Sequence, residues 1–251
     1  MGDPVDAYRN YLLVAEQNPD YGPVRVTLAE MASDSNDWTE AERHIAAAEN
    51  LGASDPRLDA LRAALDYREA IRLDDAEAMA AAKEKAASRV ETNPETIMAH
   101  RVLIDTYVRD NQPFKAIEAA NRALEIAPLD SEINRVKLGL LAQTEQMDLV
   151  GEHLQPLVSR FPEDETYRSN LISWYLSNDD IDGAETFIRG LVDPEAEDQR
   201  AQFALVQFLR QIRGPDAALE ELEQMIAATD EPLGFERIKG AILFDIGRRD
   251  E

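Results

Sequence analysis

Apolar residues recur at helical spacing along most of the chain, and the pattern is clearest between residues 107 and 128. Ala116, Ala120 and Ala123 follow one another at intervals of four and three, which places these small side chains on one face of a helix. A polar stretch before them predicts a turn. Pro128 ends the pattern, because its ring cannot continue a helix. The stretch therefore predicts the end of one helix, a turn, an amphipathic helix and a stop.

The proline stops recur with a fixed period. Pro94, Pro128 and Pro162 are separated by thirty-four residues each. A period of this length is typical of architectures built from repeated helical hairpins. Each repeat is predicted to hold two antiparallel helices, helix A and then helix B.

Within this frame the pattern resembles the tetratricopeptide repeat family. That family favours large residues at positions 4 and 24, small ones at positions 8, 20 and 27, and proline at position 32. Residues 97–130 match best, with His100, Leu103, Ile104, Tyr107, Ala116, Ala120, Ala123 and Pro128. The resemblance implies an all-α fold: a right-handed α-solenoid of antiparallel helix pairs with about fourteen helices.

The frame can be carried along nearly the whole chain, as one solenoid over residues 2–249. The repeat at 56–96 is seven residues longer than the others, about two helical turns, so its helices can lengthen without rotating their apolar face. The predicted segments are a half-repeat 2–21, repeats 22–55, 56–96, 97–130, 131–164, 165–198 and 199–232, and a half-repeat 233–249.

The two half-repeats leave end helices uncovered. Ala7, Tyr11 and Val14 fit a helix B, with Gly2-Asp3 at the preceding turn, whereas Leu233 to Ile246 fits a helix A. Two interpretations stay open. The chain is a segment of a longer array, or the half-repeats are caps that pair between molecules in self-association.

Charge and composition narrow the classes of partner. The net charge is −24, and it is spread along the chain without an acidic tail. Such a field repels nucleic acid and anionic membranes, so neither is an expected partner. No apolar run approaches the ~20 residues that span a bilayer, and no secretory signal pattern is present. We expect a soluble chain, cytoplasmic or periplasmic, with the compartment left open.

The sequence contains no catalytic or metal-binding motif. His44, His100 and His153 fall in three different repeats, and the chain has no cysteine. His100 is expected to pack at core position 4, and the other two at a surface or interface. Trp38 and Trp174 are expected to be packing residues. We therefore expect no enzymatic activity, no cofactor and no metal.

In relatives that this chain resembles, helices A line a concave groove, and positions 2, 5, 6, 9, 12 and 13 face it. The resemblance therefore implies a peptide-binding groove lined mainly by cationic side chains: Arg101, Arg109, Arg135, Asn170, Arg200, Gln207, Arg210 and Arg237.

Three interpretations of these arginines stay open. Some relatives clamp the C-terminal carboxylate of a peptide with side chains from three successive repeats. In the corresponding places Arg135, Asn170 and Arg200 match in type, whereas Gly139 and Ala204 do not. The second interpretation is another acidic peptide, since guanidinium forks suit carboxylates. The third is pairing with acids on neighbouring helices A, such as Asp105 and Glu132.

The expected function is a non-enzymatic scaffold that binds a protein or peptide partner in this Arg-lined groove. The partner is expected to be acidic or to carry a free C-terminal carboxylate. The alternative is an accessory region of a larger multidomain chaperone, envelope-assembly or polysaccharide-export protein.

Overall fold

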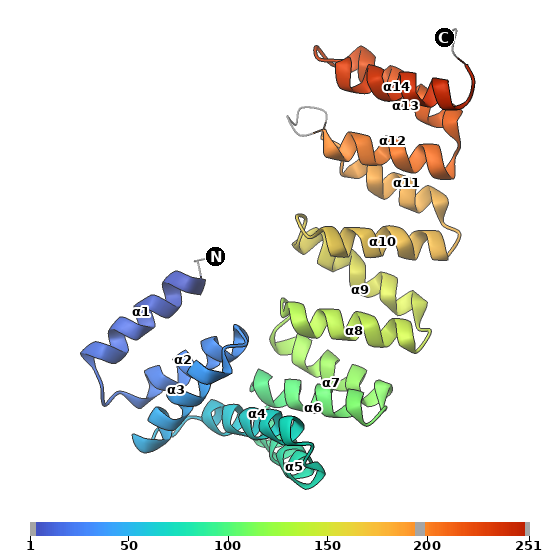
Figure 1. Cartoon of the computed structure of the whole chain (residues 1–251). Helices are drawn as coiled ribbons and strands as arrows, with labels where there is room; N and C mark the ends of the chain where they lie inside the picture. The colour runs from blue at the N-terminus through green and yellow to red at the C-terminus, as the bar shows by residue number, and fades with distance from the viewer. Residues whose placement is uncertain (1–3, 194–198, 249–251) are drawn as a thin grey trace. The chain divides into compact units, whose positions relative to one another are not determined.

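The computed structural model describes residues 4–193 and 199–248. These residues form fourteen α-helices and no strand (Figure 1), which confirms the predicted all-α fold. The turn predicted at Gly2-Asp3 and the predicted end of the last half-repeat at residue 249 lie outside the described residues. The helices are α1 (Pro4–Gln17), α2 (Gly22–Asp34), α3 (Trp38–Asn50), α4 (Pro56–Leu73), α5 (Ala76–Thr92), α6 (Ile97–Arg109), α7 (Pro113–Ile126), α8 (Ser131–Gln143), α9 (Met147–Arg160), α10 (Glu165–Ser177), α11 (Ile181–Gly190), α12 (Arg200–Ile212), α13 (Pro215–Ala228) and α14 (Leu233–Asp245).

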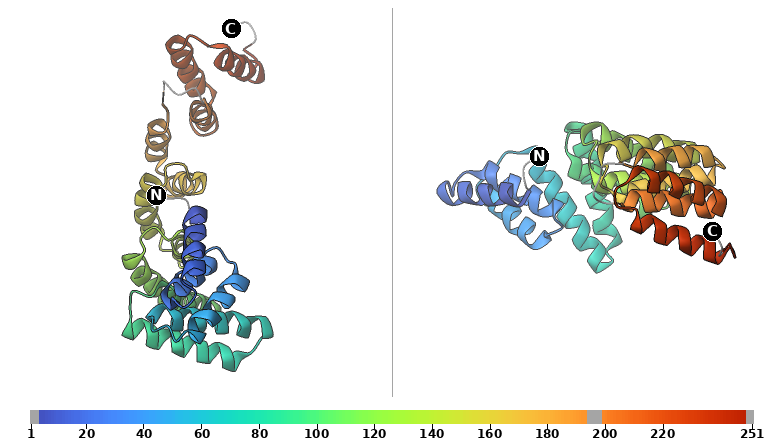
Figure 2. Two further views of the ribbon diagram at one scale, coloured as in Figure 1. Left: turned by 90° about the vertical axis from the view of Figure 1, so that its left-hand side faces the viewer. Right: turned by 90° about the horizontal axis from the view of Figure 1, so that it is seen from above.

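Even-numbered helices occupy the places predicted for helix A, and odd-numbered helices those of helix B. Pairs such as α2 with α3, α4 with α5, and α6 with α7 lie side by side as antiparallel hairpins (Figures 1 and 2). Within each hairpin both helices bury one face, so stability is built from contacts between neighbours. The exact repeat boundaries stay a prediction.

The chain divides into two compact units, residues 1–146 and 147–251, here called the N-terminal lobe and the C-terminal lobe. The N-terminal lobe holds α1–α8 and the C-terminal lobe α9–α14.

Small residues form much of the core of the N-terminal lobe. Ala116, Ala120 and Ala123 have no exposed surface, as the spacing in the sequence predicts. Leu28, Ile45 and other large side chains fill the space between these closely approaching helices. Alanine faces let backbones approach, and the larger aliphatic residues supply most of the buried apolar area.

Aromatic residues contribute more to the C-terminal lobe. The rings of Phe203 and Phe235 meet edge to face with centroids 5.4 Å apart, which joins α12 to α14. Trp174 of α10 lies over Gly151 of α9 and donates its indole N–H to the carbonyl oxygen of Met147 at 2.5 Å. A Cβ atom at residue 151 would lie 2.2 Å from the Trp174 ring, so glycine is what permits this contact.

Candidate functional site

The eight residues predicted to line a groove all lie on helices A. Seven of them are exposed, whereas Arg101 is partly buried. The structure brings three of them, Gln207, Arg210 and Arg237, into one hollow of the C-terminal lobe. The other five lie outside this hollow, and Arg101 is the one that is partly buried and paired with two acids.

Arg101 ties three helices of the N-terminal lobe together. One guanidinium nitrogen lies 2.6 Å from Asp34 at the end of α2, and the other lies 2.6 Å from Asp130. Asp130 also caps α8 by accepting from the backbone N–H of Ile133 at 3.0 Å. Burial opposes the charged form of Arg101, yet the bonds to Asp130 and Asp34 raise its pKa above the ordinary value. This cation therefore serves the fold, because both of its charged partners belong to the same lobe.

Arg109 is also engaged within the N-terminal lobe. Its Nε donates to Asp105 Oδ2 at 2.7 Å, one helical turn away on α6. The same oxygen accepts from the hydroxyl of Tyr67 at 2.8 Å, and burial is the first cause that raises the pKa of Tyr67 to about 12. The third interpretation named Asp105 as an acid on a neighbouring helix A, whereas this pair lies within α6 itself. Glu132, the other acid considered there, forms no ion pair with any described residue.

The C-terminal lobe contains a hollow of about 520 Å³ between α12 and α14, here called the basic hollow. Most of the residues that line it are apolar. Gly234 and Ala241 have small side chains, so a ligand can come close to the backbone of α14 there. None of the lining residues is acidic: Phe203, Val206, Gln207, Arg210, Gly234, Arg237, Ile238, Ala241 and Ile242.

The two cations of the basic hollow differ in their engagement. Arg210 lies 2.8 Å from Asp245, and both side chains are about half exposed. Arg237 is exposed and forms no ion pair with any residue that the structure describes. An exposed pair contributes little to stability, so Arg210 can exchange its carboxylate partner at small cost.

In the C-terminal lobe, basic residues are concentrated on helices A and acidic residues on helices B. Helices A of this lobe (α10, α12 and α14) contain five basic and three acidic residues, and α12 contains no acid. Helices B (α9, α11 and α13) contain two basic and eight acidic residues. The even spread of charge along the sequence therefore becomes an uneven spread between faces of the fold.

The remaining predicted groove residues are not part of the basic hollow. Arg135 is exposed on α8 in the N-terminal lobe, and Asn170 and Arg200 are exposed in the C-terminal lobe. Gly139 and Ala204 offer no hydrogen-bonding side chain at the other two places of the carboxylate clamp. That clamp would therefore lack two of its members.

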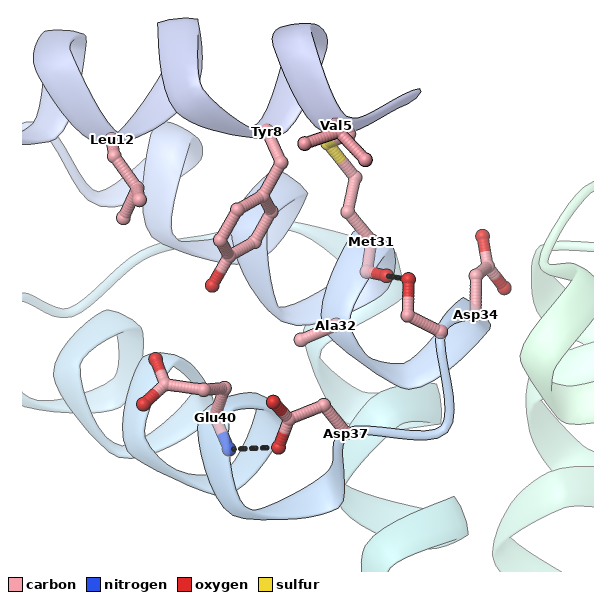
Figure 3. A pocket seen from close by; sticks show the side chains of 9 residues that line it. Val5, Tyr8, Leu12, Met31, Ala32, Asp34, Asp37 and Glu40 are labelled. Atoms are coloured by element: carbon pink, nitrogen blue, oxygen red, sulfur yellow. Dashed lines mark hydrogen bonds between the residues drawn. The ribbon is translucent and has the colours of Figure 1, made fainter. Parts of the chain in front are cut away.

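A second pocket, of about 640 Å³, lies between α1, α2 and the start of α3, and it was not predicted from the sequence. Val5, Tyr8 and Leu12 reach into it from α1, opposite Met31 and Ala32 of α2 (Figure 3). The helical spacing of the three α1 residues is the signal that could have found it. Asp34, Asp37 and Glu40 also line it (Figure 3), and we call it the acidic pocket.

His44 contacts Tyr8, one of the residues that line the acidic pocket. Its Nε2 is 3.4 Å from the hydroxyl of Tyr8, and its side chain is 1% exposed. Burial, with help from Arg43 and Arg25, lowers the pKa of His44, so the ring is neutral at neutral pH. Burial next to Glu40 raises the pKa of Tyr8. Tyr8 and His44 therefore add no charge next to the pocket.

Two other kinds of feature are absent from the part of the chain that the structure describes. No group of three His, Cys, Asp or Glu side chains is arranged to hold a metal ion. No described helix combines the length and the apolar character of a membrane span.

Comparison with known proteins gives a family match over part of the chain and a fold for most of it. A model of the tetratricopeptide repeat family matches residues 1–65. No curated protein sequence matches the chain. The match confirms the predicted tetratricopeptide repeats over residues 1–65.

Solved structures with the same fold have distant sequences. The structure of Naa15/Naa10 bound to HypK-THB has a TM-score of 0.54 at 14% identity, over 91% of this chain and 35% of that one. Pseudomonas aeruginosa pilF has a TM-score of 0.52 at 9% identity, over 88% and 97% of the two chains. Yeast Tom70 has a TM-score of 0.50 at 17% identity, over 95% and 47%. The chain thus spans about a third of the first of these and nearly all of the second, and the likeness is one of fold. A helical-repeat fold of this kind is a scaffold for protein interactions.

Proposed function

We propose that this tetratricopeptide-repeat protein is a non-enzymatic scaffold that binds an acidic peptide segment of a partner protein in the basic hollow between α12 and α14. One observation carries the proposal. A chain of net charge −24 places Arg210 and Arg237 over an apolar floor that no acidic residue lines.

The hollow has the composition that peptide recognition needs. Apolar walls supply affinity through burial of ligand side chains, and a few well-placed polar groups fix the orientation. Guanidinium groups donate two parallel hydrogen bonds to a carboxylate, which an ammonium group cannot do in the same fixed geometry. Gln207 adds an amide that can both donate and accept.

The acidity of the rest of the chain does not prevent this binding. At physiological ionic strength, exposed charges are largely screened beyond a Debye length of about 8 Å. Within that distance the charged residues that line the hollow are Arg210 and Arg237, and Asp245, which pairs with Arg210, is not among the lining residues. Distant acidic surfaces slow the approach of an acidic peptide and leave the local selection to the arginines.

The partner carboxylate has two sources, a Glu or Asp side chain or the C-terminus of a peptide. Two of the five places of the carboxylate clamp hold Gly139 and Ala204, which cannot bind a C-terminal carboxylate. We therefore propose that the ligand groups are Glu or Asp side chains. The alternative of an accessory region in a larger chaperone, envelope-assembly or polysaccharide-export protein stays a hypothesis, and the same hollow would serve in either setting.

The test is a binding assay with a fluorescein-labelled amphipathic peptide of Leu and Glu whose C-terminus is amidated. Fluorescence anisotropy should show binding to the native chain, and the double variant Arg210→Ala/Arg237→Ala should bind about tenfold or more weakly. The matched control is Arg160→Ala, which removes an exposed cation of the same lobe outside the hollow. Equal binding by the double variant and the control would contradict the proposal, and a requirement for a free C-terminus would point to the carboxylate clamp.

A further inference from the structure

The acidic pocket between α1, α2 and α3 has walls that a ligand can use. Val5 is 63% exposed, and Tyr8, Leu12 and Met31 are only partly buried, although all of them line the cavity. Figure 3 shows the three α1 side chains and Met31 directed toward the same space. At about 640 Å³ the cavity falls within the size range of ligand-binding pockets in proteins.

The charged residues at this pocket have one sign. Asp34, Asp37 and Glu40 line it, and no cationic residue does. Asp34 is already paired with Arg101 at 2.6 Å, and Glu40 with Arg43. Asp37 accepts from the backbone N–H of Glu40 at 3.1 Å and forms no ion pair with a described residue.

The surrounding helices leave little positive charge to compensate. Residues 4–50 contain nine acidic and three basic residues. Arg9 pairs with Asp6 at 3.1 Å, Arg25 donates to the carbonyl oxygen of Ala15 at 3.4 Å, and Arg43 contacts Glu40. The field at the pocket therefore favours a cation.

We propose that the acidic pocket is a second binding site, for a segment of a partner protein that presents an apolar side chain next to Lys or Arg. The apolar side chain enters the cavity between Tyr8, Leu12 and Met31, and the cationic group lies against Asp37 and Glu40. An acidic segment is rejected here, because like charges brought together at a desolvated site cost binding free energy.

This inference is independent of the proposed function. The basic hollow and the acidic pocket belong to different lobes. Each is lined largely by apolar residues, and the charged residues that line them have opposite sign. The two sites therefore select opposite chemistry, and one can fail its test while the other passes.

The test uses the full chain and labelled amphipathic peptides in fluorescence anisotropy. A peptide of Leu and Lys should bind about tenfold or more tightly than a peptide in which Ser replaces each Leu, because each buried Leu is worth roughly 1.5–3 kcal/mol. Equal binding by the two peptides would show that the chain merely attracts positive charge, which would overturn the proposal.

A pair of charge variants locates the site. Asp37→Asn/Glu40→Gln should weaken binding of the Leu–Lys peptide roughly fivefold to tenfold, since exposed ion pairs are worth up to about 1 kcal/mol each. Asparagine also caps helices well, so α3 keeps its N-cap in this variant. The control Glu16→Gln/Glu42→Gln removes the same charge from exposed positions of α1 and α3 outside the pocket. Equal effects of the two double variants would overturn the proposal.

Sedimentation without peptide tests the competing occupant, a second copy of this chain. We expect the same sedimentation coefficient for the native chain and for Val5→Lys, which places a cation at the rim. A dimer that this substitution dissociates would overturn the assignment to a basic partner.

Discussion

At the scale of single residues, the fourth position of helix A joins one repeat to the loop before it. His100 Nε2 lies 2.8 Å from the carbonyl oxygen of Pro94, Asn134 donates to that of Pro128 at 3.0 Å, and Gln202 donates to that of Asp193 at 3.0 Å. All three side chains are buried. A buried polar side chain that lacks a hydrogen-bond partner is costly, so the loop carbonyl oxygens satisfy these buried residues and tie each helix A to the loop before it.

Replacing Asn134 by alanine tests this role. The change leaves the carbonyl oxygens of Pro128 and Asp130 without the side-chain donor that now lies 3.0 and 2.9 Å away. The free energy of unfolding should fall by about 1–3 kcal/mol, measured by thermal and urea denaturation followed by circular dichroism.

Asn121→Ala is the matched control, because Asn121 is exposed on α7 and has no hydrogen bond of its side chain to a described residue. Its effect should stay within about 0.5 kcal/mol. A loss of the same size in both variants would show that the carbonyl contacts do not matter.

The sequence predicted burial at this position and not its hydrogen bonds. The repeat frame placed His100 at a core position, and its side chain is 2% exposed. The acceptor lies six residues earlier, in a loop whose carbonyl direction depends on how two repeats dock. Such a contact follows from tertiary geometry and leaves no periodic signal in the sequence.

At the scale of helices and turns, the turns from helix A to helix B share one backbone feature. Asn36, Asn111, Glu145 and Asp179 have positive φ values of 54–59°, and each is followed within a few residues by a helix B. Asn and Asp tolerate this left-handed conformation better than most residues, so the polar turns were predictable. The positive φ of Glu145 was not predictable, because glutamate has no preference for the left-handed conformation.

Replacement by alanine should change the melting temperature in opposite directions at two helical glycines, because only one of them lies in the close contact between α9 and α10. Glycine to alanine in a helix normally stabilises by about 0.5–1 kcal/mol. Gly151→Ala should instead lower the melting temperature, because the new Cβ would overlap the Trp174 ring, and overpacking costs about 1–3 kcal/mol. Gly240→Ala on α14 meets no atom within 4 Å and should raise it.

Thermal denaturation of both variants measures the difference, at about 2–4 °C per kcal/mol for a chain of this size. A rise in both melting temperatures would mean that Trp174 does not lie over Gly151. The sequence predicted Trp174 as a packing residue, and its glycine partner twenty-three residues earlier could not be predicted without the docked helices.

At the scale of the whole molecule, folding decides which charges remain available. The sequence predicted arginines on helices A, and the structure places them there. Arg101 meets an acid sixty-seven residues away and Arg210 one thirty-five residues away, which no local pattern indicates. The sequence therefore predicted the helices that carry the arginines, and it could not tell engaged arginines from available ones.

The central claim is that an acidic peptide binds in the basic hollow between α12 and α14. Its most direct test is a ¹⁵N-labelled sample of the full chain titrated with the amidated Leu–Glu peptide, with amide chemical shifts followed by NMR. We predict that the largest shift changes fall on Arg200–Ile212 and Leu233–Asp245, and that Arg210→Ala/Arg237→Ala reduces them. Changes confined to the acidic helices α9, α11 and α13, or the same changes in the double variant, would contradict the account.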